Sequence, residues 1–178
     1  MNDAPLRVMD RAGALRHAFD RSFAVPTQID ATPMEDFLAI GVGSEACAIR
    51  LSEITGLFVD KKITRVPGRT AALLGIAGFR GTVVPAYDLH VFLGHPMAKT
   101  PRWLVIALGA PIALAFEALD GHVRVSRDAI LRREAGEHMR PHVDEVVRLQ
   151  DRVRPIVHLP SVLDVIRRQK SEAALIEE

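Results

Sequence analysis

Residues 73–93 read LLGIAGFRGTVVPAYDLHVFL, an apolar stretch with a single arginine near its middle. The stretch is rich in β-branched and aromatic residues, which is typical of β-strands. Burying an unpaired charge is costly, and Gly78 and Gly81 near Arg80 permit a turn or a bulge. We therefore predict that Arg80 points outward, where its guanidinium can pair with a carboxylate of this chain or of a partner.

Pieces of the first half of the chain recur in the second half. FLAIGVG begins at Phe37 and WLVIALG begins at Trp103, an offset of 66 residues. Because the matches come in the same order, they indicate a duplication in which each half is a similar small β unit, with Phe79 and Leu149 at equivalent core positions. Two further sets of positions match, at offsets of 65 and 70 residues: Ile49, Leu51, Ile54 and Gly56 with Leu114, Phe116, Leu119 and Gly121, and Leu73, Ile76, Phe79, Pro85 and Leu89 with Val143, Val146, Leu149, Pro155 and Leu159.

Short apolar runs bounded by turn residues predict β-strands along most of the chain. FLAIGV, CAIRL and WLVIAL are such runs, and WLVIALGAPIALAF predicts two strands around a turn. Gly56 predicts a bulge, and the prolines at 85 and 155 predict strand edges or bulges. Helices are predicted only for residues 11–22, near 129–134 and for 162–170. The predicted fold class is mainly β, with two related barrels and short N- and C-terminal helices.

Composition and charge exclude several classes of protein. The 178 residues suit one domain, or two small ones that share a core. A net charge of +1 and an aromatic content of 5% argue against nucleic-acid binding. The single cysteine, Cys47, excludes an internal disulfide framework and favours a reducing compartment. The start MNDAPLRVMD has no apolar signal segment, and the longest uncharged run is shorter than a membrane helix of about 20 residues, so we expect a soluble cytoplasmic protein.

The sequence predicts no catalytic, metal or cofactor site. His138 and His142 have a suggestive spacing, but Pro141 would disrupt the helix that brings both rings to one face. GVGSEA at residues 41–46 lacks the Lys-Ser/Thr pair of a phosphate-binding loop, so a hairpin turn is predicted there. A small-barrel enzyme of unrecognised type and a nucleic-acid binder stay as remote alternatives.

The motif LLGIAGFRGTVVPAYDL resembles the central pattern of the CheW family of bacterial chemotaxis adaptor proteins. The flanking segments FLAIGVGSEACAIRLSEI and ITRVP are also similar to the family, as are WLVIALGAPIALAFEALDGHVRV and VVRLQDRVRPIVHLPSVL in the second half. The resemblance covers about residues 35–167, most of the chain. The positions that fit the central pattern are Gly75, Ile76, Arg80, Gly81, Val83, Val84, Pro85, Asp88 and Leu89.

The resemblance implies two five-stranded barrels on a shared core, with no catalysis and no cofactor. It implies an adaptor that couples the cytoplasmic tip of a chemoreceptor to the regulatory domain of a CheA-type histidine kinase, at membrane-associated receptor arrays and without inserting into the membrane. Self-association through CheW-like domains is a further expectation. Partner contacts are implied at Arg80, Gly75, Gly81 and Ile54. The alternative for Arg80 is a solvated or internally paired turn arginine, and for Gly75 a simple turn glycine.

The predicted domains are an N-terminal extension at 1–34, the CheW-like domain at 35–168 and a polar C-terminal tail at 169–178. Within the extension, an apolar stripe predicts a helix that is too short to be stable alone in water. Its stripe consists of Val8, Ala12, Leu15, Phe19 and Phe23. Two alternatives stay open. The helix docks on this chain's own barrels, or Leu15, Phe19 and Phe23 insert into a groove of a different partner, which would make the protein a divergent scaffold.

Overall fold

The computed structural model describes residues 33–68, 70–98, 100–133, 140–149 and 152–175, with side chains as far as residue 172. The chain divides into two units, Met1–Thr32 and Pro33–Glu178. All described residues belong to the second unit. The predicted N-terminal helix, with Leu15, Phe19 and Phe23, lies outside the described residues.

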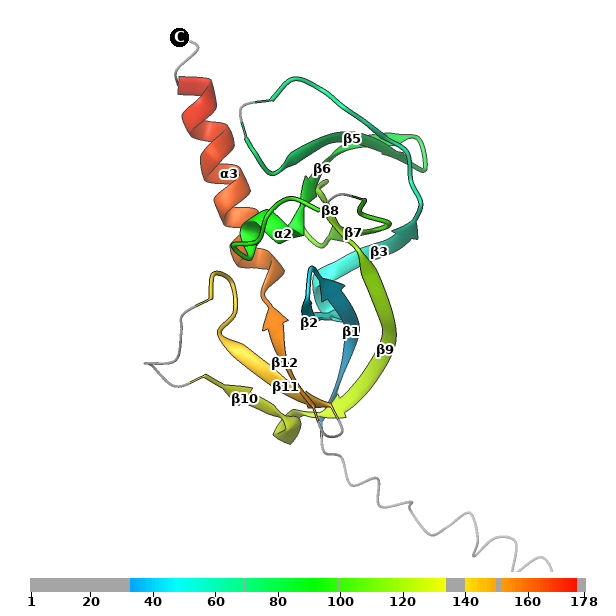
Figure 1. The fold of residues 1–178 in the computed structure, drawn as a ribbon, viewed down its shortest axis with the longest axis vertical. Helices are drawn as coiled ribbons and strands as arrows, with labels where there is room; N and C mark the ends of the chain where they lie inside the picture. The colour runs from blue at the N-terminus through cyan, green and yellow to red at the C-terminus, as the bar shows by residue number, and fades with distance from the viewer. Residues whose placement is uncertain (1–32, 69, 99, 134–139, 150–151, 176–178) are drawn as a thin grey trace, which may run out of the picture. The chain divides into compact units, whose positions relative to one another are not determined.

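Two curled β-sheets account for most of the described chain (Figure 1). The first half supplies β1 (Met34–Val42), β2 (Glu45–Arg50), β3 (Ile54–Val59), β4 (Ile63–Thr64), β5 (Leu73–Phe79) and β6 (Thr82–Asp88). The second half supplies β7 (Trp103–Ala107), β8 (Ala113–Phe116), β9 (Ala118–Ser126), β10 (Ile130–Arg132), β11 (Glu145–Leu149) and β12 (Arg152–Val157). The helices are α2 (Leu89–Phe92) and α3 (Leu159–Leu175), and the 3-10 turns are η1 (Leu51–Glu53) and η2 (Arg127–Ala129).

Each sheet combines strands from both halves of the chain. The first sheet has the order β10-β11-β12-β2-β1-β9, and the second has the order β3-β7-β8-β6-β5-β4. If β7–β12 repeat β1–β6, the two orders are the same order read in opposite directions. The mainly β fold with two related subdomains is thereby confirmed. Two details differ from expectation: neither half is a barrel by itself, and each sheet has six strands in the described chain rather than five, since the very short β4 and β10 add one to each.

The pairing registers show the duplication residue by residue. Phe79 and Leu149 each end the first strand of a hairpin, β5–β6 and β11–β12, so their predicted equivalence is confirmed. Each hairpin also places its proline opposite the matching apolar residue, in the pairs Ile76–Pro85 and Val146–Pro155.

The bulge predicted at Gly56 is confirmed as well. The β3–β7 register shifts between Ile54 and Gly56. The β9–β1 register shifts at the equivalent place in the second half, between Leu119 and Gly121. Both halves therefore bend the same strand at the same position, which is how a sheet curls toward a barrel.

One alignment of the repeat is wrong by a single residue. Phe37 pairs with Arg50, whose equivalent at the offset of 65 is Ala115, and Ala115 pairs with Leu104. Phe37 is therefore equivalent to Leu104, an offset of 67 (104 − 37), and not to Trp103. Successive side chains of a strand point to opposite faces, so a slip of one residue exchanges the two faces of the strand. Accordingly, Phe37 and Leu104 are buried, whereas Trp103 is only partly buried.

The buried apolar residues form three clusters. The largest joins both sheets to α2 and α3 and includes Ile40, Phe116 and Ile166. A second cluster lies inside the curl of the β3–β4 sheet and contains Leu104, and a third lies inside the curl of the β9–β10 sheet and contains Phe37. The two subdomains therefore each have an interior, and they share the largest cluster.

The helix predictions are only partly right. α3 is confirmed but longer than predicted, since it begins at Leu159 and continues to Leu175, into the stretch predicted to be a polar tail. The helix predicted near 129–134 is wrong, because η2 is followed by β10, which pairs with β11. Sequence reasoning missed α2. No helix in the described part of the chain has the length and apolar character needed to cross a bilayer.

Cys47 lies on β2 in the largest cluster, with 1% of its surface exposed. Burial raises the pKa of its thiol from the ordinary 9.0 to about 11. Because only the thiolate reacts with alkylating agents, we expect the native protein to resist iodoacetamide at pH 8 and the urea-unfolded chain to react quickly. Mass spectrometry of the two samples measures this. Equal rates of labelling would contradict the buried position.

Candidate partner-binding surface

Arg80 and Gly81 form the two-residue turn that joins β5 to β6. Phe79 pairs with Thr82 on either side of the turn, and the backbone φ is +49° at Arg80 and +85° at Gly81. Two positive φ values are typical of a type I′ turn, whose twist matches that of a hairpin. Glycine adopts this conformation freely, whereas the left-handed region costs any other residue about 1–2 kcal/mol. The protein therefore keeps an arginine at a position where its backbone is strained.

The Arg80 side chain is exposed, and no residue in the described part of the chain forms a hydrogen bond or an ion pair with it. The outward direction is as predicted, and the internally paired alternative is not what the structure shows. Val83 lies close by on β6, and its 63% exposure is the highest of the large apolar residues described. Val83 pairs with Gly78, so no side chain on β5 stands opposite it. We call Gly78, Arg80, Gly81 and Val83 the hairpin tip.

Aromatic packing supports the hairpin tip from the inner side. The ring of Phe79 lies 4.6 Å from the ring of Phe58 on β3, centroid to centroid. The ammonium of Lys61 sits 5.6 Å from the centroid of the Phe58 ring and 6.0 Å from that of Phe79. Aromatic contacts and cation–π contacts of this kind each contribute roughly 0.5–1.5 kcal/mol. The turn that presents Arg80 is thus anchored on a packed pair of rings.

Gly75 is not a turn residue. It is buried within β5, its φ is +143°, and the register of the β5–β6 pair shifts beside it. A Cβ at this position would lie 2.1 Å from the carbonyl oxygen of Thr64 on β4. The structure therefore explains this glycine by the close approach of two backbones, and the simple turn glycine considered above is wrong.

Ile54 lies at the start of β3 and packs against the largest cluster, the one shared by both sheets. Phe79 at the base of the hairpin tip belongs to a different cluster. Of the four implied contact residues, the structure therefore brings only Arg80 and Gly81 together on one surface. Sequence reasoning missed Val83, although the pair Val83–Val84 contained the signal, because only one of two successive strand residues can face the core.

A network around Arg50 was also missed. Arg50 donates from Nε to Glu35 at 3.1 Å and from an Nη atom to Glu145 at 2.5 Å. Burial opposes the charge on Arg50, but the hydrogen bonds to Glu145 and Glu35 outweigh it and raise the pKa of the guanidinium. The network ties β1, β2 and β11 of one sheet together. Because it is largely enclosed and internally paired, it holds the sheet rather than presenting a binding surface.

Glu53 links the two sheets to α3. Its Oε2 accepts a hydrogen bond from the backbone N–H of Leu159, at 2.8 Å, which satisfies one of the free donors at the start of the helix. Burial raises the pKa of the Glu53 carboxyl, and the bond from Leu159 acts in the opposite direction. A charge at a helix N-terminus is favourable when negative, so Glu53 acts as a cap supplied from a distant part of the chain.

The described residues hold no cluster of three or more His, Cys, Asp or Glu side chains suited to a metal ion. Of the two histidines with suggestive spacing, His138 lies outside the described residues. His142 forms a hydrogen bond through Nδ1 with the hydroxyl of Ser161 at 2.7 Å. Burial lowers the pKa of His142. The geometry that the chain does present is a protein surface, and the hairpin tip is its most distinctive part.

Comparison with protein families decides what this fold is. The CheW-like domain matches residues 36–167 of the chain. The chain belongs to the CheW family. The matched range includes every described strand after the first two residues of β1, together with both hairpins and the start of α3.

Among solved structures, this CheW-like chain is similar to the scaffolding protein TtCheW from Thermoanaerobacter tengcongensis. The two are 18% identical, with a TM-score of 0.60, and the match covers 69% of this chain and 88% of TtCheW. At this identity the likeness shows a shared fold. A search of the curated proteins found no match.

Proposed function

We propose that this CheW-like protein is a non-catalytic adaptor that couples a chemoreceptor to a CheA-type histidine kinase in the cytoplasm, at membrane-associated arrays. Membership of the CheW family supports a scaffold role. The observation that carries the specific proposal is Arg80, which is exposed, strained in its backbone and without a partner in the described chain. Strain of this kind persists where it serves a function.

The hairpin tip offers two kinds of contact side by side. The guanidinium of Arg80 can form a forked, charge-assisted pair with a carboxylate of the kinase regulatory domain or of the receptor tip. Val83 adds an apolar contact that a partner can cover. The positive φ at Gly81 sets the direction in which the turn presents the arginine. Gly75 contributes from within β5 by holding the hairpin against β4, and Ile54 would contact a partner only on a separate surface at the start of β3.

Replacing Arg80 with asparagine separates folding from binding. Asn-Gly is the preferred pair for a type I′ turn, so Arg80→Asn should relieve about 1–2 kcal/mol of strain, and each kcal/mol raises Tm by roughly 2–4 °C at this chain length. Binding should weaken by roughly 1.5–3 kcal/mol, about 10- to 150-fold, because a charge-assisted contact is lost. Calorimetric titrations with the kinase regulatory domain and with the receptor tip measure the affinity, and thermal unfolding measures Tm.

Arg132→Asn provides a matched control. Arg132 is 90% exposed on β10 of the other sheet, and its ion pair with Glu145 is long, at 3.9 Å. We expect both affinities to be unchanged in this variant. If Arg80→Asn also leaves both affinities unchanged in a folded protein, the proposed role of the hairpin tip is wrong.

A further inference from the structure

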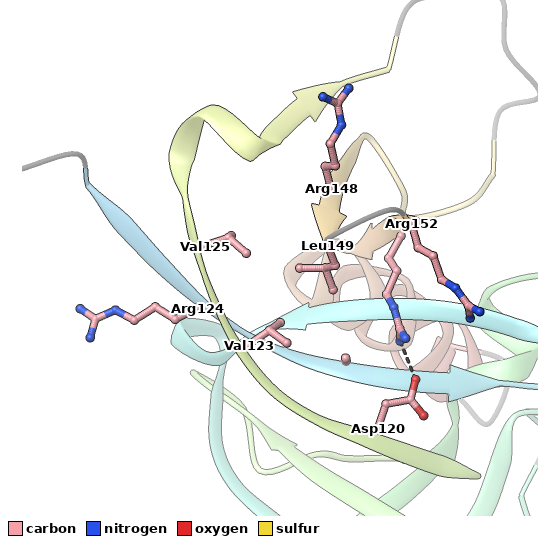
Figure 2. A pocket seen from close by; sticks show the side chains of 9 residues that line it. Asp120, Val123, Arg124, Val125, Arg148, Leu149 and Arg152 are labelled. Carbon is pink, nitrogen blue, oxygen red and sulfur yellow. Dashed lines mark hydrogen bonds and ion pairs between the residues drawn. The ribbon is translucent and has the colours of Figure 1, made fainter.

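A groove opens on the β10–β9 sheet, away from the strands of the hairpin tip. Its volume is about 660 Å³, within the usual range for binding sites. Apolar side chains of Val123, Val125 and Leu149 form one part of the lining, and arginines form most of the rest (Figure 2). We call it the seam groove. β9 supplies one side of it, and the β11–β12 hairpin supplies the other.

The equivalent place in the other sheet is filled. At the offset of 65 residues Phe58 is equivalent to Val123, and at the offset of 70 Phe79 is equivalent to Leu149. The Phe58 and Phe79 rings contact each other at 4.6 Å and close that seam, with Lys61 over both. Valine and leucine are smaller, so the second seam stays open. The duplication therefore supplies an internal comparison: the same structural position is packed in one subdomain and open in the other.

The seam groove borders an unpaired strand edge. β9 and β10 are the two end strands of their sheet, and within the described chain β9 pairs only with β1. One edge of β9 therefore presents backbone N–H and C=O groups that have no strand partner. Such an edge pairs readily with an extended segment of another chain.

The charges on the lining favour an acidic occupant. Four arginines stand against one aspartate: Arg124, Arg148, Arg152 and Arg154 against Asp120. Arg154 is already paired with Asp120 at 2.6 Å, the dashed contact in Figure 2. Arg124 points away from the groove (Figure 2). Arg148 and Arg152 are exposed, and neither has a hydrogen bond or an ion pair within the described residues. These two supply the free positive charge.

The lining also argues against a nucleotide or a nucleic acid. Its described residues include no aromatic ring on which a base could stack, and roughly half of the contact surface it offers is aliphatic. An alternating peptide strand suits both parts of the lining, because its apolar side chains face one side and its carboxylates the other.

We propose that the seam groove binds an extended acidic segment of a partner protein, which adds to the free edge of β9, packs its aliphatic side chains on Val123, Val125 and Leu149, and pairs its carboxylates with Arg148 and Arg152. The proposal does not rest on the hairpin tip, which lies on the other sheet. It gives the protein a second interaction surface of different chemistry, so that two partners can be held at once.

A designed peptide tests the proposal. The probe is a fluorescein-labelled heptapeptide of sequence Glu-Val-Glu-Val-Glu-Val-Glu, and the control probe has lysine in place of each glutamate. We expect the acidic probe to bind the full-length protein in fluorescence polarisation at low salt, and the lysine probe to bind at least about tenfold more weakly. In amide NMR spectra the acidic probe should shift the signals of β9, including Val123 and Val125, and should leave the hairpin tip unchanged.

Two double variants separate charge from shape. Arg148→Glu with Arg152→Glu should weaken binding of the acidic probe by at least about tenfold. Val123→Phe with Leu149→Phe copies the aromatic pair of the other seam, and it should abolish binding while all four arginines remain. Arg132→Glu is the charge control and should change affinity less than twofold. Circular dichroism checks that each variant is folded, and the arginine variant decides the matter if the phenylalanine variant does not fold.

Three results would overturn the proposal. One is a folded Val123→Phe and Leu149→Phe protein that binds the acidic probe as well as the original does. Another is a set of NMR shifts that avoids β9. The third is displacement of the probe by inorganic pyrophosphate at equal concentration, which would show a site for small anions rather than for a peptide strand.

Discussion

Replacing Gly75 with alanine should destabilise the protein by more than about 4 kcal/mol, or prevent folding altogether. The new Cβ would lie 2.1 Å from the carbonyl oxygen of Thr64 and 3.0 Å from the Cα of Arg65, and both are backbone atoms that cannot move aside as a side chain would. The φ of +143° adds a conformational cost that only glycine avoids. β4 would have to separate from β5, and losses of this size arise when strain and broken packing act together.

Gly78→Ala is the matched control, three residues further along the same strand. Its φ is not positive, and a Cβ there would meet no heavy atom within 4 Å. Alanine has less backbone freedom than glycine in the unfolded chain, so this variant should be neutral or slightly stabilising. Urea unfolding of the two variants measures the difference. Similar midpoints would show that β5 can move away from β4, and that the glycine is not needed for the close approach.

The sequence was sufficient to predict the strands, because their signals are local. Apolar alternation, the bulge at Gly56 and the repeated prolines each depend on a few neighbouring residues, and the structure confirms them. The one-residue error at Phe37 has a physical cause too. FLAIGV and WLVIAL are apolar on both faces, so no alternation of polar residues fixes which face is buried, and only the strand pairing does so.

The exchange of strands between the two halves could not be predicted in the same way. The parallel pairs β2–β12 and β6–β8 join residues that lie far apart in the chain, and no single segment carries a signal for them. The same holds for Glu53, which caps a helix that begins 106 residues later. A family resemblance supplies the general fold, but long-range polar contacts such as this one depend on the particular side chains of this chain.

The candidate surfaces show a similar limit. Arg80 could be singled out from its neighbours, because a charge between glycines in an apolar strand must leave the core. The seam groove could not, since its lining comes from β1, β9, β11 and β12, and its openness depends on the absence of large rings at Val123 and Leu149. The repeat contained the clue. Aligning Phe58 with Val123 and Phe79 with Leu149 shows a loss of volume at two facing positions.

Asp88 brings these two kinds of evidence together, because the sequence motif marks it and the structure explains it. It is fully buried and accepts three hydrogen bonds at the start of α2. Oδ1 accepts from the backbone N–H and from Nδ1 of His90, at 2.9 and 2.8 Å, and Oδ2 accepts from the backbone N–H of Ala98 at 2.6 Å. Gly43 donates its N–H to Nε2 of His90, which leaves the ring proton on Nδ1.

The equivalent residue in the second half, at the offset of 70, is His158, which has no carboxylate. At that helix the cap comes instead from Glu53, through the N–H of Leu159. Both helices therefore begin at equivalent buried leucines, Leu89 and Leu159, and each N-terminus receives a carboxylate by a different route. This makes a carboxylate at the start of α2 a requirement of the fold, separate from any contact with a partner.

Asp88→Asn should accordingly destabilise the protein by about 3–5 kcal/mol although the side chain keeps its shape. All three groups that face Asp88 are donors, so the amide NH₂ of asparagine must point at one of them and leave it unsatisfied. Asp164→Asn is the control, since Asp164 is 58% exposed and pairs only with Arg167 on α3, and this variant should unfold at the original urea concentration. Urea unfolding followed by circular dichroism compares the two. An Asp88→Asn protein as stable as the control would mean that the three hydrogen bonds are dispensable and that the motif aspartate is kept for a partner instead.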